Sequence, residues 1–333
     1  MYEIEMEKGI ITLDEYKLIN NYIERLIENS IPVIFDLRHL RKILKIPKNE
    51  QKLYFDEKEE KRYRSFKIPK KSGGYRLIEA PVDGLKLRQR WIKNEIIDKF
   101  KISEHAKGYK KHTSIYNNAL PHVNKELVVN IDIENFFPTI RYESIYKFFV
   151  YVGYNKQVAH LLTKMCTNSK KHLPQGAPTS PSLSNILLLK LDKRLSELAK
   201  KANAQYTRYV DDITFSGSKN IKTFVPTIIN IIEDEGYEIN KKKLRLQYSN
   251  QRQVVTGLTV NKKVSVSKKK IKEIENAIYY SKKFGIVEHM KKIDCQKSFY
   301  KEHLYGIAYF IKMIDKEKGE NYLKGLDEVD WIY

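Results

Sequence analysis

The sequence predicts an α+β fold built around a sheet that helices cover on one side. Residues 127–133 form a short, nearly continuous apolar run, which is typical of a strand buried on both faces. Apolar and aromatic residues on both sides of Asp211-Asp212 predict two strands with a turn at the aspartates. Segments of helical periodicity accompany them. The order strand–helix–helix–strand–strand–helix–strand over residues 127–246 therefore matches a split βαβ sheet.

The first part of the chain contains one expected helix and one expected hairpin. Residues 14–29 repeat apolar side chains at helical spacing, and Pro32 follows them. Residues 63–69 and 75–78 have the β-type composition of two short strands. The glycine-rich segment 70–74 joins them, which predicts a hairpin.

Further helices are expected over 85–100, 142–152, 180–200 and 225–235, and again from residue 267 to the C-terminus. In the first of them, we expect Leu87, Trp91, Ile96 and Phe100 to face inward. Ser180 is the expected cap of its helix, because Pro181 suits the first helical turn.

The charge of the chain indicates a polyanionic partner. Its 333 residues carry 62 basic and 41 acidic side chains, a formal net charge of +21. Residues 240–272 contain eleven Lys or Arg and no acid, and 61–78 is a second basic stretch without acids. Such runs are often only solvated faces, but here β-type apolar residues interleave with them. That pattern favours a groove that follows phosphates, so nucleic acid is the expected partner and a membrane surface the competing one.

Other features indicate a cytoplasmic protein with no membrane partner. No apolar run approaches the length of a membrane span, and the acidic N-terminus has no signal-peptide pattern. The two cysteines, Cys166 and Cys295, have no metal-ligand spacing and form no disulfide framework.

Three aspartates are the candidates for chemistry. Neighbouring side chains on a regular strand point apart, so Asp211 and Asp212 converge only if the chain turns there. Asp132 lies 79 residues earlier, at the end of the expected buried strand. Three carboxylates at one point would suit hard divalent cations, and a pair of such ions catalyses nucleotidyl transfer. An aspartate pair on a solvated loop is the structural alternative.

Three further motifs accompany these aspartates in order along the chain. Phe137 follows Asp132 in an Asp-Ile-Glu-Asn-Phe-Phe-Pro run, and Gln175-Gly176 lie in Leu-Pro-Gln-Gly-Ala-Pro-Thr-Ser-Pro. Lys242 and Lys243 come after the aspartate pair. Together, over residues 63–258, this set resembles the reverse transcriptases. The segments Asn118-Ala-Leu-Pro-His122 and Val255-Thr256-Gly257 resemble the two signatures of bacterial retron enzymes.

This resemblance implies a right-hand polymerase fold. The implied parts are an N-terminal helical extension over 1–35, fingers over 36–126 and 139–179, a palm over 127–138 and 180–257, and a helical thumb over 258–333. It also implies roles for individual residues. The catalytic residues would be Asp132, Asp211 and Asp212. The metal ligands would be Asp132, Ile133, Asp211 and Asp212, which would hold two Mg²⁺ ions, with Mn²⁺ as the other possibility. Nucleotide-binding residues would be Lys67, Lys70, Arg76, Phe137, Gln175, Gly176 and Lys243, with Lys242 an equal candidate to Lys243 by position. RNA- or primer-binding residues would be Asn118, His122, Val255, Thr256 and Gly257.

Each of the weaker candidates has a structural alternative. Lys67 and Lys70 also suit an ordinary surface, Phe137 a core, and Gln175-Gly176 a simple turn. Asn118 and His122 would either bind RNA or support the palm.

The expected activity is that of a retron reverse transcriptase. Such an enzyme uses deoxynucleoside triphosphates to copy a cognate structured non-coding RNA into branched RNA-linked DNA, primed from an RNA 2′-hydroxyl. It would act in anti-phage defence with an effector protein. The alternatives are an intron-like, phage-exclusion or untemplated bacterial relative, or a non-catalytic RNA-binding scaffold.

Overall fold

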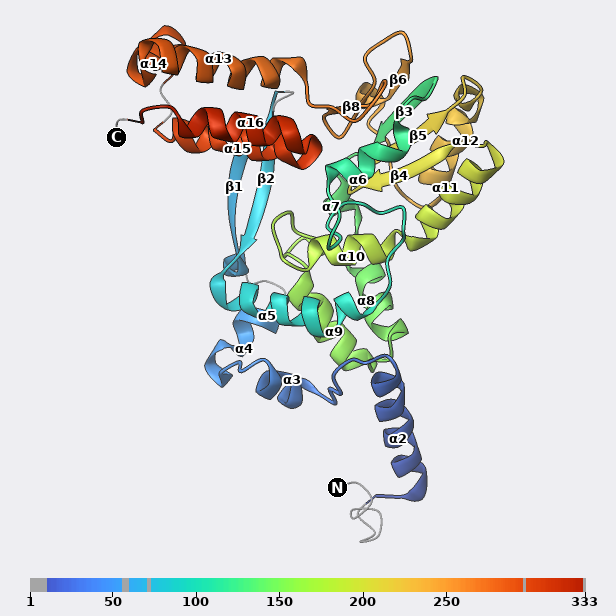
Figure 1. The fold of residues 1–333 in the computed structure, drawn as a ribbon. Helices are drawn as coiled ribbons and strands as arrows, with labels where there is room; N and C mark the ends of the chain where they lie inside the picture. The colour runs from blue at the N-terminus through green and yellow to red at the C-terminus, as the bar shows by residue number, and fades with distance from the viewer. Residues whose placement is uncertain (1–10, 56–59, 71–72, 296–297, 332–333) are drawn as a thin grey trace. The chain divides into compact units, whose positions relative to one another are not determined.

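A computed structural model describes residues 11–55, 60–70, 73–295 and 298–331 (Figure 1). The first ten residues of the expected N-terminal extension, and residues 71–72 of the glycine-rich link, lie outside this part. The chain divides into two compact units. Unit 1 comprises Met1–Tyr109, Ile133–Arg194 and Ile232–Glu238, and unit 2 comprises Lys110–Asp132, Leu195–Ile231 and Ile239–Tyr333.

Unit 1 is mainly helical and is organised around helix α9, Lys156–Cys166. Seven of its eleven residues are buried, and it contacts α3, α4, α5 and α8. The helices of this unit are α2 Leu13–Glu28, α3 Leu37–Ile43, α4 Gln51–Phe55, α5 Asp83–Glu95, α7 Phe136–Thr139, α8 Tyr142–Tyr151 and α10 Ser180–Leu187. Short 3-10 turns lie at η1 Lys48–Glu50, η2 Glu60–Arg62 and η3 Ile97–Lys99.

The expected N-terminal helix and hairpin of unit 1 are confirmed. Helix α2 begins after Thr12, which forms a reciprocal capping box with Glu15. Strands β1, Tyr63–Pro69, and β2, Tyr75–Pro81, pair antiparallel from Tyr63↔Pro81 to Pro69↔Tyr75. The second strand runs three residues further than the sequence predicted.

The inward face predicted for the helix over 85–100 is confirmed at Ile96, which is fully buried, and is wrong at Leu87; Trp91 and Phe100 are half-buried. Leu87 is 66% exposed, and α5 instead buries Leu85, Arg88, Gln89 and Ile92. Main-chain oxygens accept most of the hydrogen bonds that these two polar side chains donate: Arg88 donates to the carbonyls of Gly84 and Lys45 at 2.8 and 3.0 Å, and Gln89 to that of Met165 at 2.7 Å. Arg88 Nε and Gln89 Oε1 remain buried without a partner. The helix also ends at Glu95, followed by η3, rather than continuing to residue 100.

The helix expected over 180–200 is two helices. α10 ends at Leu187 and α11, Leu189–Lys201, follows directly. Thr179, not Ser180, occupies the N-cap position. The Ser180 hydroxyl instead donates to the carbonyl oxygen of Pro174 at 2.8 Å, so it closes the preceding loop rather than capping the helix.

Unit 2 contains a four-stranded antiparallel sheet in the order β4-β5-β3-β6. The strands are β3 Leu127–Asp132, β4 Gln205–Tyr209, β5 Asp212–Gly217 and β6 Arg245–Tyr248 (Figure 1). The inner strand β3 is buried along nearly its whole length, as its apolar run predicted. Helix α6, Ile115–Ala119, and the 3-10 turn η4, Leu120–His122, contact β4, and η4 also contacts β5. The α+β class and its antiparallel sheet are therefore confirmed.

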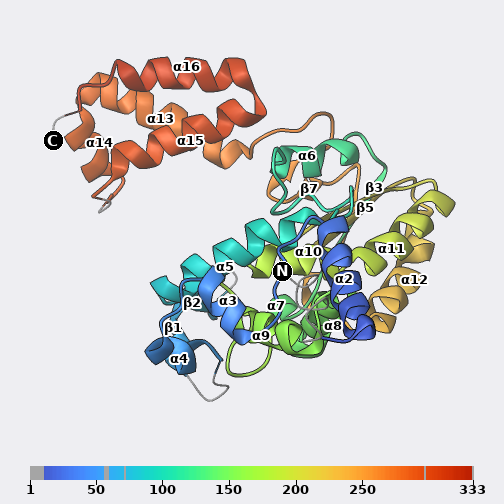
Figure 2. The ribbon, with the colours of Figure 1, turned by 90° about the horizontal axis from the view of Figure 1, so that it is seen from below.

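The rest of unit 2 is the small hairpin β7–β8, Val254–Val255 and Leu258–Thr259, and a group of helices. These are α13 Lys268–Phe284, α14 Ile286–Lys292, α15 Tyr300–Ile314 and α16 Lys316–Asp327, with α15 alongside α16 (Figure 2). One apolar core joins the hairpin residue Leu258 to Ile274, Leu304 and Leu326 of the helices. The remaining elements are helix α12, Ile221–Asp234, and the 3-10 turn η5, Lys241–Lys243, which lie between β5 and β6 in the chain.

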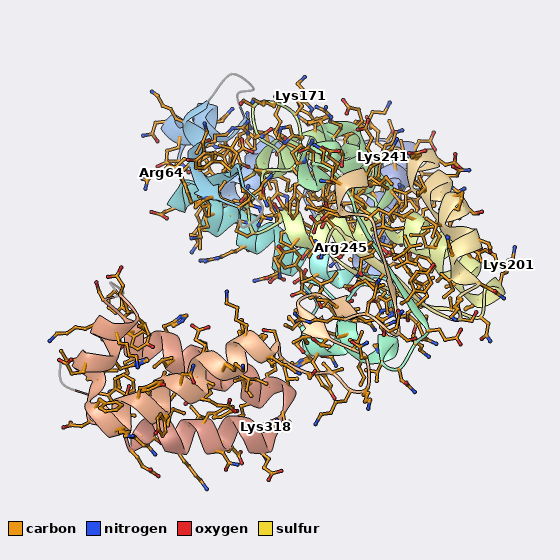
Figure 3. The ribbon with its side chains drawn as sticks, turned by 90° about the horizontal axis from the view of Figure 1, so that it is seen from above. Arg64, Lys171, Lys201, Lys241, Arg245 and Lys318 are labelled. Atoms are coloured by element: carbon orange, nitrogen blue, oxygen red, sulfur yellow. The ribbon has the colours of Figure 1, made fainter. Side chains whose placement is uncertain are left out.

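Basic side chains lie on many of these elements. Figure 3 labels exposed examples from strands, helices and loops: Arg64, Lys171, Lys201, Lys241, Arg245 and Lys318. None of the helices in the described ranges has the length and apolar character needed to cross a membrane.

Candidate active site

The three aspartates lie close together at one end of the two inner strands of the sheet in unit 2. Asp132 is the last residue of β3 and Asp212 is the first of β5, and the two are direct partners in the strand register. Tyr209 pairs with Asp212, so only Val210 and Asp211 form the loop between β4 and β5. The turn predicted at the aspartate pair is confirmed. It brings Asp211 beside the two strand-end carboxylates.

The turn at the aspartates is strained. Val210 has a φ of 64°, in the left-handed region that β-branched residues rarely adopt. The guanidinium of Arg208, which is fully buried, donates to the Val210 carbonyl oxygen at 3.0 Å. The buried arginine therefore helps to hold the loop in this conformation. Sequence reasoning missed Arg208, although a cation beside a predicted metal-binding turn was a usable signal.

The carboxylates strongly influence one another. Loss of surrounding solvent, followed by the charges of Asp211 and Asp132, raises the pKa of Asp212 to about 7. Asp132 also hydrogen-bonds to Asp212. Both neighbouring carboxylates disfavour a negative charge on Asp212, because like charges repel. A bound cation or a proton would relieve the repulsion between these carboxylates.

A lysine side chain supplies positive charge next to these carboxylates. Lys243, in η5, places its Nζ 2.8 and 2.9 Å from the two carboxylate oxygens of Asp132. Of the two lysines that the sequence left open, Lys243 is therefore the one in contact with the aspartates. The Asp132 carbonyl oxygen accepts a hydrogen bond from Asn240 N at 2.8 Å, which ties β3 to the segment that carries this lysine.

The donor set suits hard divalent cations, because it consists of carboxylate oxygens that repel one another in the absence of positive charge. Among the residues that the structure describes, no group of three or more His, Cys, Asp or Glu side chains is already arranged to hold a metal. The ammonium of Lys243 contacts both oxygens of Asp132, one of the candidate ligands. Ile133 is 1% exposed, and only its main-chain oxygen could serve as a ligand.

The candidate nucleotide-binding residues other than Lys243 belong to unit 1. Lys67, Lys70 and Arg76 are exposed on or beside the β1–β2 hairpin. The loop that contains Gln175 and Gly176 reaches this hairpin, because the Gln175 carbonyl oxygen accepts a hydrogen bond from Glu79 N at 2.9 Å.

Two of these positions have clear structural constraints. Gly176 has a φ of 135°, and a Cβ there would lie 3.0 Å from the Glu79 carbonyl oxygen, so both conformation and space favour glycine. Phe137 is 8% exposed, and its ring lies 5.2 Å, centroid to centroid, from that of Phe136, which is also buried.

The residues Asn118 and His122 are fully buried in unit 2. His122 contacts Ser216 Oγ of β5 at 2.6 Å through Nδ1 and Thr207 Oγ1 of β4 at 2.8 Å through Nε2. Asn118 donates to Thr256 Oγ1 at 3.4 Å. As placed, neither side chain offers an atom to RNA, and their contacts match the second alternative, support of the sheet that carries the aspartates.

The Val255-Thr256-Gly257 segment forms the tight turn between β7 and β8. Val255 pairs with Leu258, which leaves Thr256 and Gly257 as a two-residue loop with φ angles of 45° and 83°. Two successive positive φ angles are the mark of a type I′ hairpin turn, which favours glycine. Val255 is buried in the core, and Gly257 is exposed.

Comparisons with known proteins identify the family of the chain. A family model for reverse transcriptase (RNA-dependent DNA polymerase) matches residues 68–272. The retron Ec86 reverse transcriptase of Escherichia coli is 33% identical, over 93% of this chain and 94% of that protein. The retron Mx65 reverse transcriptase of Myxococcus xanthus is 32% identical, over 78% of this chain and 62% of that protein. Among solved structures, a telomerase from Candida albicans with a fragment of telomeric RNA aligns at a TM-score of 0.46 and 12% identity, over 95% of this chain and 65% of that chain.

The family match extends over more than half of the chain and includes all three aspartates. It confirms the expected right-hand polymerase fold and an activity that takes an RNA template and nucleotide substrates. The chain belongs to the reverse transcriptases, the RNA-directed DNA polymerases, and among them to the retron type.

Proposed function

We propose that this reverse transcriptase copies part of a cognate structured non-coding RNA into single-stranded DNA that remains joined to the RNA. Synthesis begins from a 2′-hydroxyl of that RNA, and the branched product acts with an effector protein in anti-phage defence. The observation that carries the catalytic part is the Asp132↔Asp212 register with Asp211 in the adjoining turn. The retron relatives support the branched product, and the net charge of +21 supports a polyanionic partner.

In this proposal Asp132, Asp211 and Asp212 hold two divalent cations, Mg²⁺ or Mn²⁺, with the main-chain oxygen of Ile133 as a further ligand. When bound, these ions activate the primer hydroxyl and stabilise charge on the leaving pyrophosphate. The chain itself orients the carboxylates through the strand register and the bond from Arg208 to the turn. Lys243 carries a positive charge beside Asp132 and is placed to attract the phosphates of the incoming nucleotide.

The remaining assignments concern the nucleotide and the parts of the fold. Lys67, Lys70 and Arg76 contact the triphosphate, Gln175 and Gly176 lie beside the incoming nucleotide, and Phe137 packs against its sugar. Val255, Thr256 and Gly257 contact the primer strand. We keep the division into extension (1–35), fingers (36–126, 139–179), palm (127–138, 180–257) and thumb (258–333). We also keep a cytoplasmic location, which the free thiols Cys166 and Cys295 support.

A primer-extension assay with deoxynucleotides tests the catalytic part. The double variant Asp211→Asn, Asp212→Asn should lose DNA synthesis and retain RNA binding, because it removes cation ligands without adding bulk. Asp330→Asn, at an exposed position far along the chain, is the matched control and should remain active. Chelation of divalent cations should stop the reaction, and added Mg²⁺ or Mn²⁺ should restore it. Extension by the double variant would contradict the assignment.

Sequencing of the nucleic acid that co-purifies with the protein tests the product. We expect one structured RNA joined to DNA through a 2′ linkage, so that a debranching enzyme separates the two. DNA without such a linkage would instead favour an intron-like or untemplated activity. Co-purification of the same RNA without any DNA, together with inactive but folded protein, would favour the RNA-binding scaffold.

A further inference from the structure

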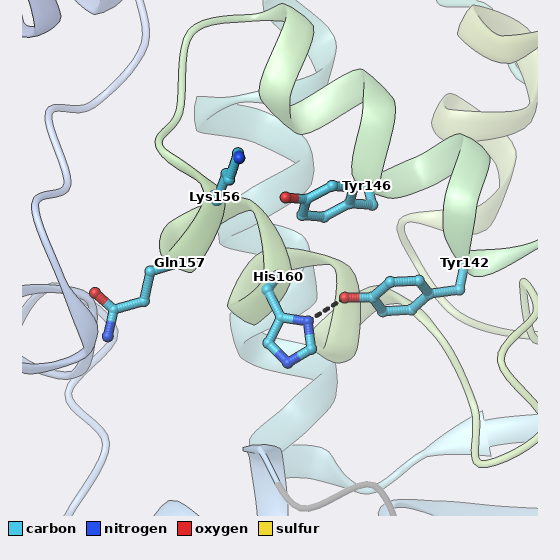
Figure 4. Close-up of a pocket in the computed structure, with 5 residues that line it drawn as sticks. All are labelled: Tyr142, Tyr146, Lys156, Gln157 and His160. Atoms are coloured by element: carbon cyan, nitrogen blue, oxygen red, sulfur yellow. Dashed lines mark hydrogen bonds between the residues drawn. The ribbon is translucent and has the colours of Figure 1, made fainter.

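Unit 1 contains a cavity that none of the roles above uses. It is a shallow depression, widely open to solvent, with a volume of about 390 Å³ between α8 and α9 (Figure 4). The residues that line it are Tyr142, Tyr146, Lys156, Gln157 and His160. Such a volume is within the range of small-molecule and nucleotide sites. The three catalytic aspartates are not among the lining residues, and they belong to unit 2.

One wall of the cavity is aromatic and fixed in position. Tyr142 and Tyr146 lie one helical turn apart on α8, with ring planes 11° apart and centroids 6.2 Å apart. The hydroxyl of Tyr142 hydrogen-bonds to Nδ1 of His160 on α9, as Figure 4 shows. This bond links the two helices and orients the rings of Tyr142 and His160, and the Tyr146 ring stacks on that of Tyr142. A flat ligand would therefore meet an aromatic surface that is already ordered, which reduces the entropy lost on binding.

The other wall is polar and positively charged. Lys156 and Gln157 form the first turn of α9, and both are exposed. Among the residues that the structure describes, none of those that line the cavity is acidic. Residues 141–171, which include both helices, contain six Lys or Arg and one Glu. The surroundings therefore favour an anion, and the amide of Gln157 adds both a donor and an acceptor.

A ligand that combines a flat heterocycle, hydrogen-bonding edges and a negative charge is a nucleotide. Aromatic side chains stack on bases of any identity, and lysine compensates the adjoining phosphate. Bases in a duplex hide their faces in the helical stack, whereas bases in single-stranded loops are exposed. This enzyme works on RNA, and a structured RNA supplies such loops.

We propose that the cavity between α8 and α9 binds an unpaired nucleotide of an RNA chain, outside the polymerase site. Its base stacks against the Tyr146 side of the aromatic wall, and its phosphate lies by Lys156. The contact would anchor one single-stranded point of the RNA on unit 1.

Binding of a fluorescein-labelled twelve-nucleotide single-stranded RNA of mixed sequence, followed by anisotropy, tests this proposal. Tyr146→Ala should weaken binding about 5- to 160-fold, the range known for loss of one base–aromatic stack. Lys156→Ala should weaken it less and should lower the salt dependence by about one phosphate contact. Tyr146→Phe should bind like the unaltered protein, because the ring is kept.

Two residues of α8 that do not line the cavity provide matched controls for Tyr146 and Lys156. Tyr151 is 85% exposed at the end of α8, and Lys147 is exposed in its middle. Tyr151→Ala and Lys147→Ala remove the same chemical groups and should leave the affinity within about twofold of the unaltered protein. Circular dichroism of each variant establishes that it is folded.

Photo-crosslinking adds a readout that is specific to the site. The same RNA carrying 4-thiouridine should crosslink to peptides of α8 or α9, and Tyr146→Ala should reduce only these crosslinks. Extension of a short primer on an unstructured template should be unchanged, which separates this site from the catalytic one.

Three results would overturn the proposal. The first is equal affinity of the Tyr146→Ala and Tyr151→Ala variants for the RNA. The second is no preference for the single strand over an RNA duplex of equal length. The third is displacement of the RNA by millimolar ATP, which would mark a site for free nucleotides.

Discussion

Replacement of His122 tests how the sheet that carries the aspartates is supported. The ring bridges Thr207 of β4 and Ser216 of β5, and all three side chains are at most 2% exposed. His122→Leu would leave two buried hydroxyls without their partner. Each such group costs about 1 to 3 kcal/mol, so the free energy of unfolding should fall by about 2 to 6 kcal/mol.

Removal of the two hydroxyls provides the matched control. In the triple variant His122→Leu, Thr207→Val, Ser216→Ala, no polar group is stranded, so at least half of the lost stability should return. Urea unfolding followed by circular dichroism measures all the variants. If the triple variant proves no more stable than His122→Leu alone, the hydrogen bonds are not the source of the loss.

The pH dependence of the free energy of unfolding gives a second, independent test of His122. Burial, followed by the nearby charge of Lys125, lowers the pKa of His122 to about 3. An unfolded histidine has a pKa of about 6.5, so between these values the unfolded chain binds the additional proton. Stability from His122 is therefore complete above about pH 6.5 and is lost as the pH falls towards 3. At pH 5 the loss is about 1.5 × 1.36, or about 2 kcal/mol.

The corresponding assay compares urea unfolding at pH 8 and pH 5. The unaltered protein should lose about 2 kcal/mol more between these pH values than His122→Leu does, because only the former carries this proton-linked site. Other titrating groups contribute equally to both proteins and cancel in the difference. An identical pH dependence of the two proteins would refute the assignment of a buried, neutral His122.

Three glycine positions give further predictions. Gly319→Ala should destabilise the α13–α16 core by about 1 to 3 kcal/mol in urea unfolding, because its Cβ would lie 2.2 Å from Lys312 Cα. Gly306→Ala, the matched control on α15, meets nothing within 4 Å and should stabilise by about 0.5 to 1 kcal/mol; equal effects would contradict the packing. Gly257→Ala should cost about 1 to 2 kcal/mol from conformation alone, since its φ is 83° and the space is open, and a neutral result would exclude the type I′ turn.

The features that the sequence predicted well are those determined locally. The sequence identified β3 by its apolar run and β4 and β5 by the strand-forming residues on either side of Asp211-Asp212. Because β3 and β5 are antiparallel, the last residue of β3, Asp132, lies beside the first residue of β5, Asp212. The β1–β2 hairpin followed in the same way from its strand composition and its glycines.

Features that depend on distant partners could not be predicted. Apolar periodicity assigned Leu87 to the inside of its helix, whereas Arg88 and Gln89 are buried because carbonyls from Lys45 and Met165 receive their hydrogen bonds. The burial of Arg208 likewise depends on the fold around it. Sequence alone left two roles open for His122, because its two hydroxyl partners come from strands more than 80 residues away.

The contact between Lys243 and Asp132 has a consequence for the resting enzyme. A group of carboxylates without nearby positive charge would weaken the attraction of this surface for polyanions. Lys243 neutralises the charge of one of them, Asp132. If Asp132 ligates a divalent cation as proposed, Lys243 would compete with that cation for the carboxylate, and this competition would lower the apparent affinity for the cation. The ammonium of Lys243, once released from Asp132, would be available to an anionic substrate. Uptake of the ion and readiness for the nucleotide would thereby be coupled through a single side chain.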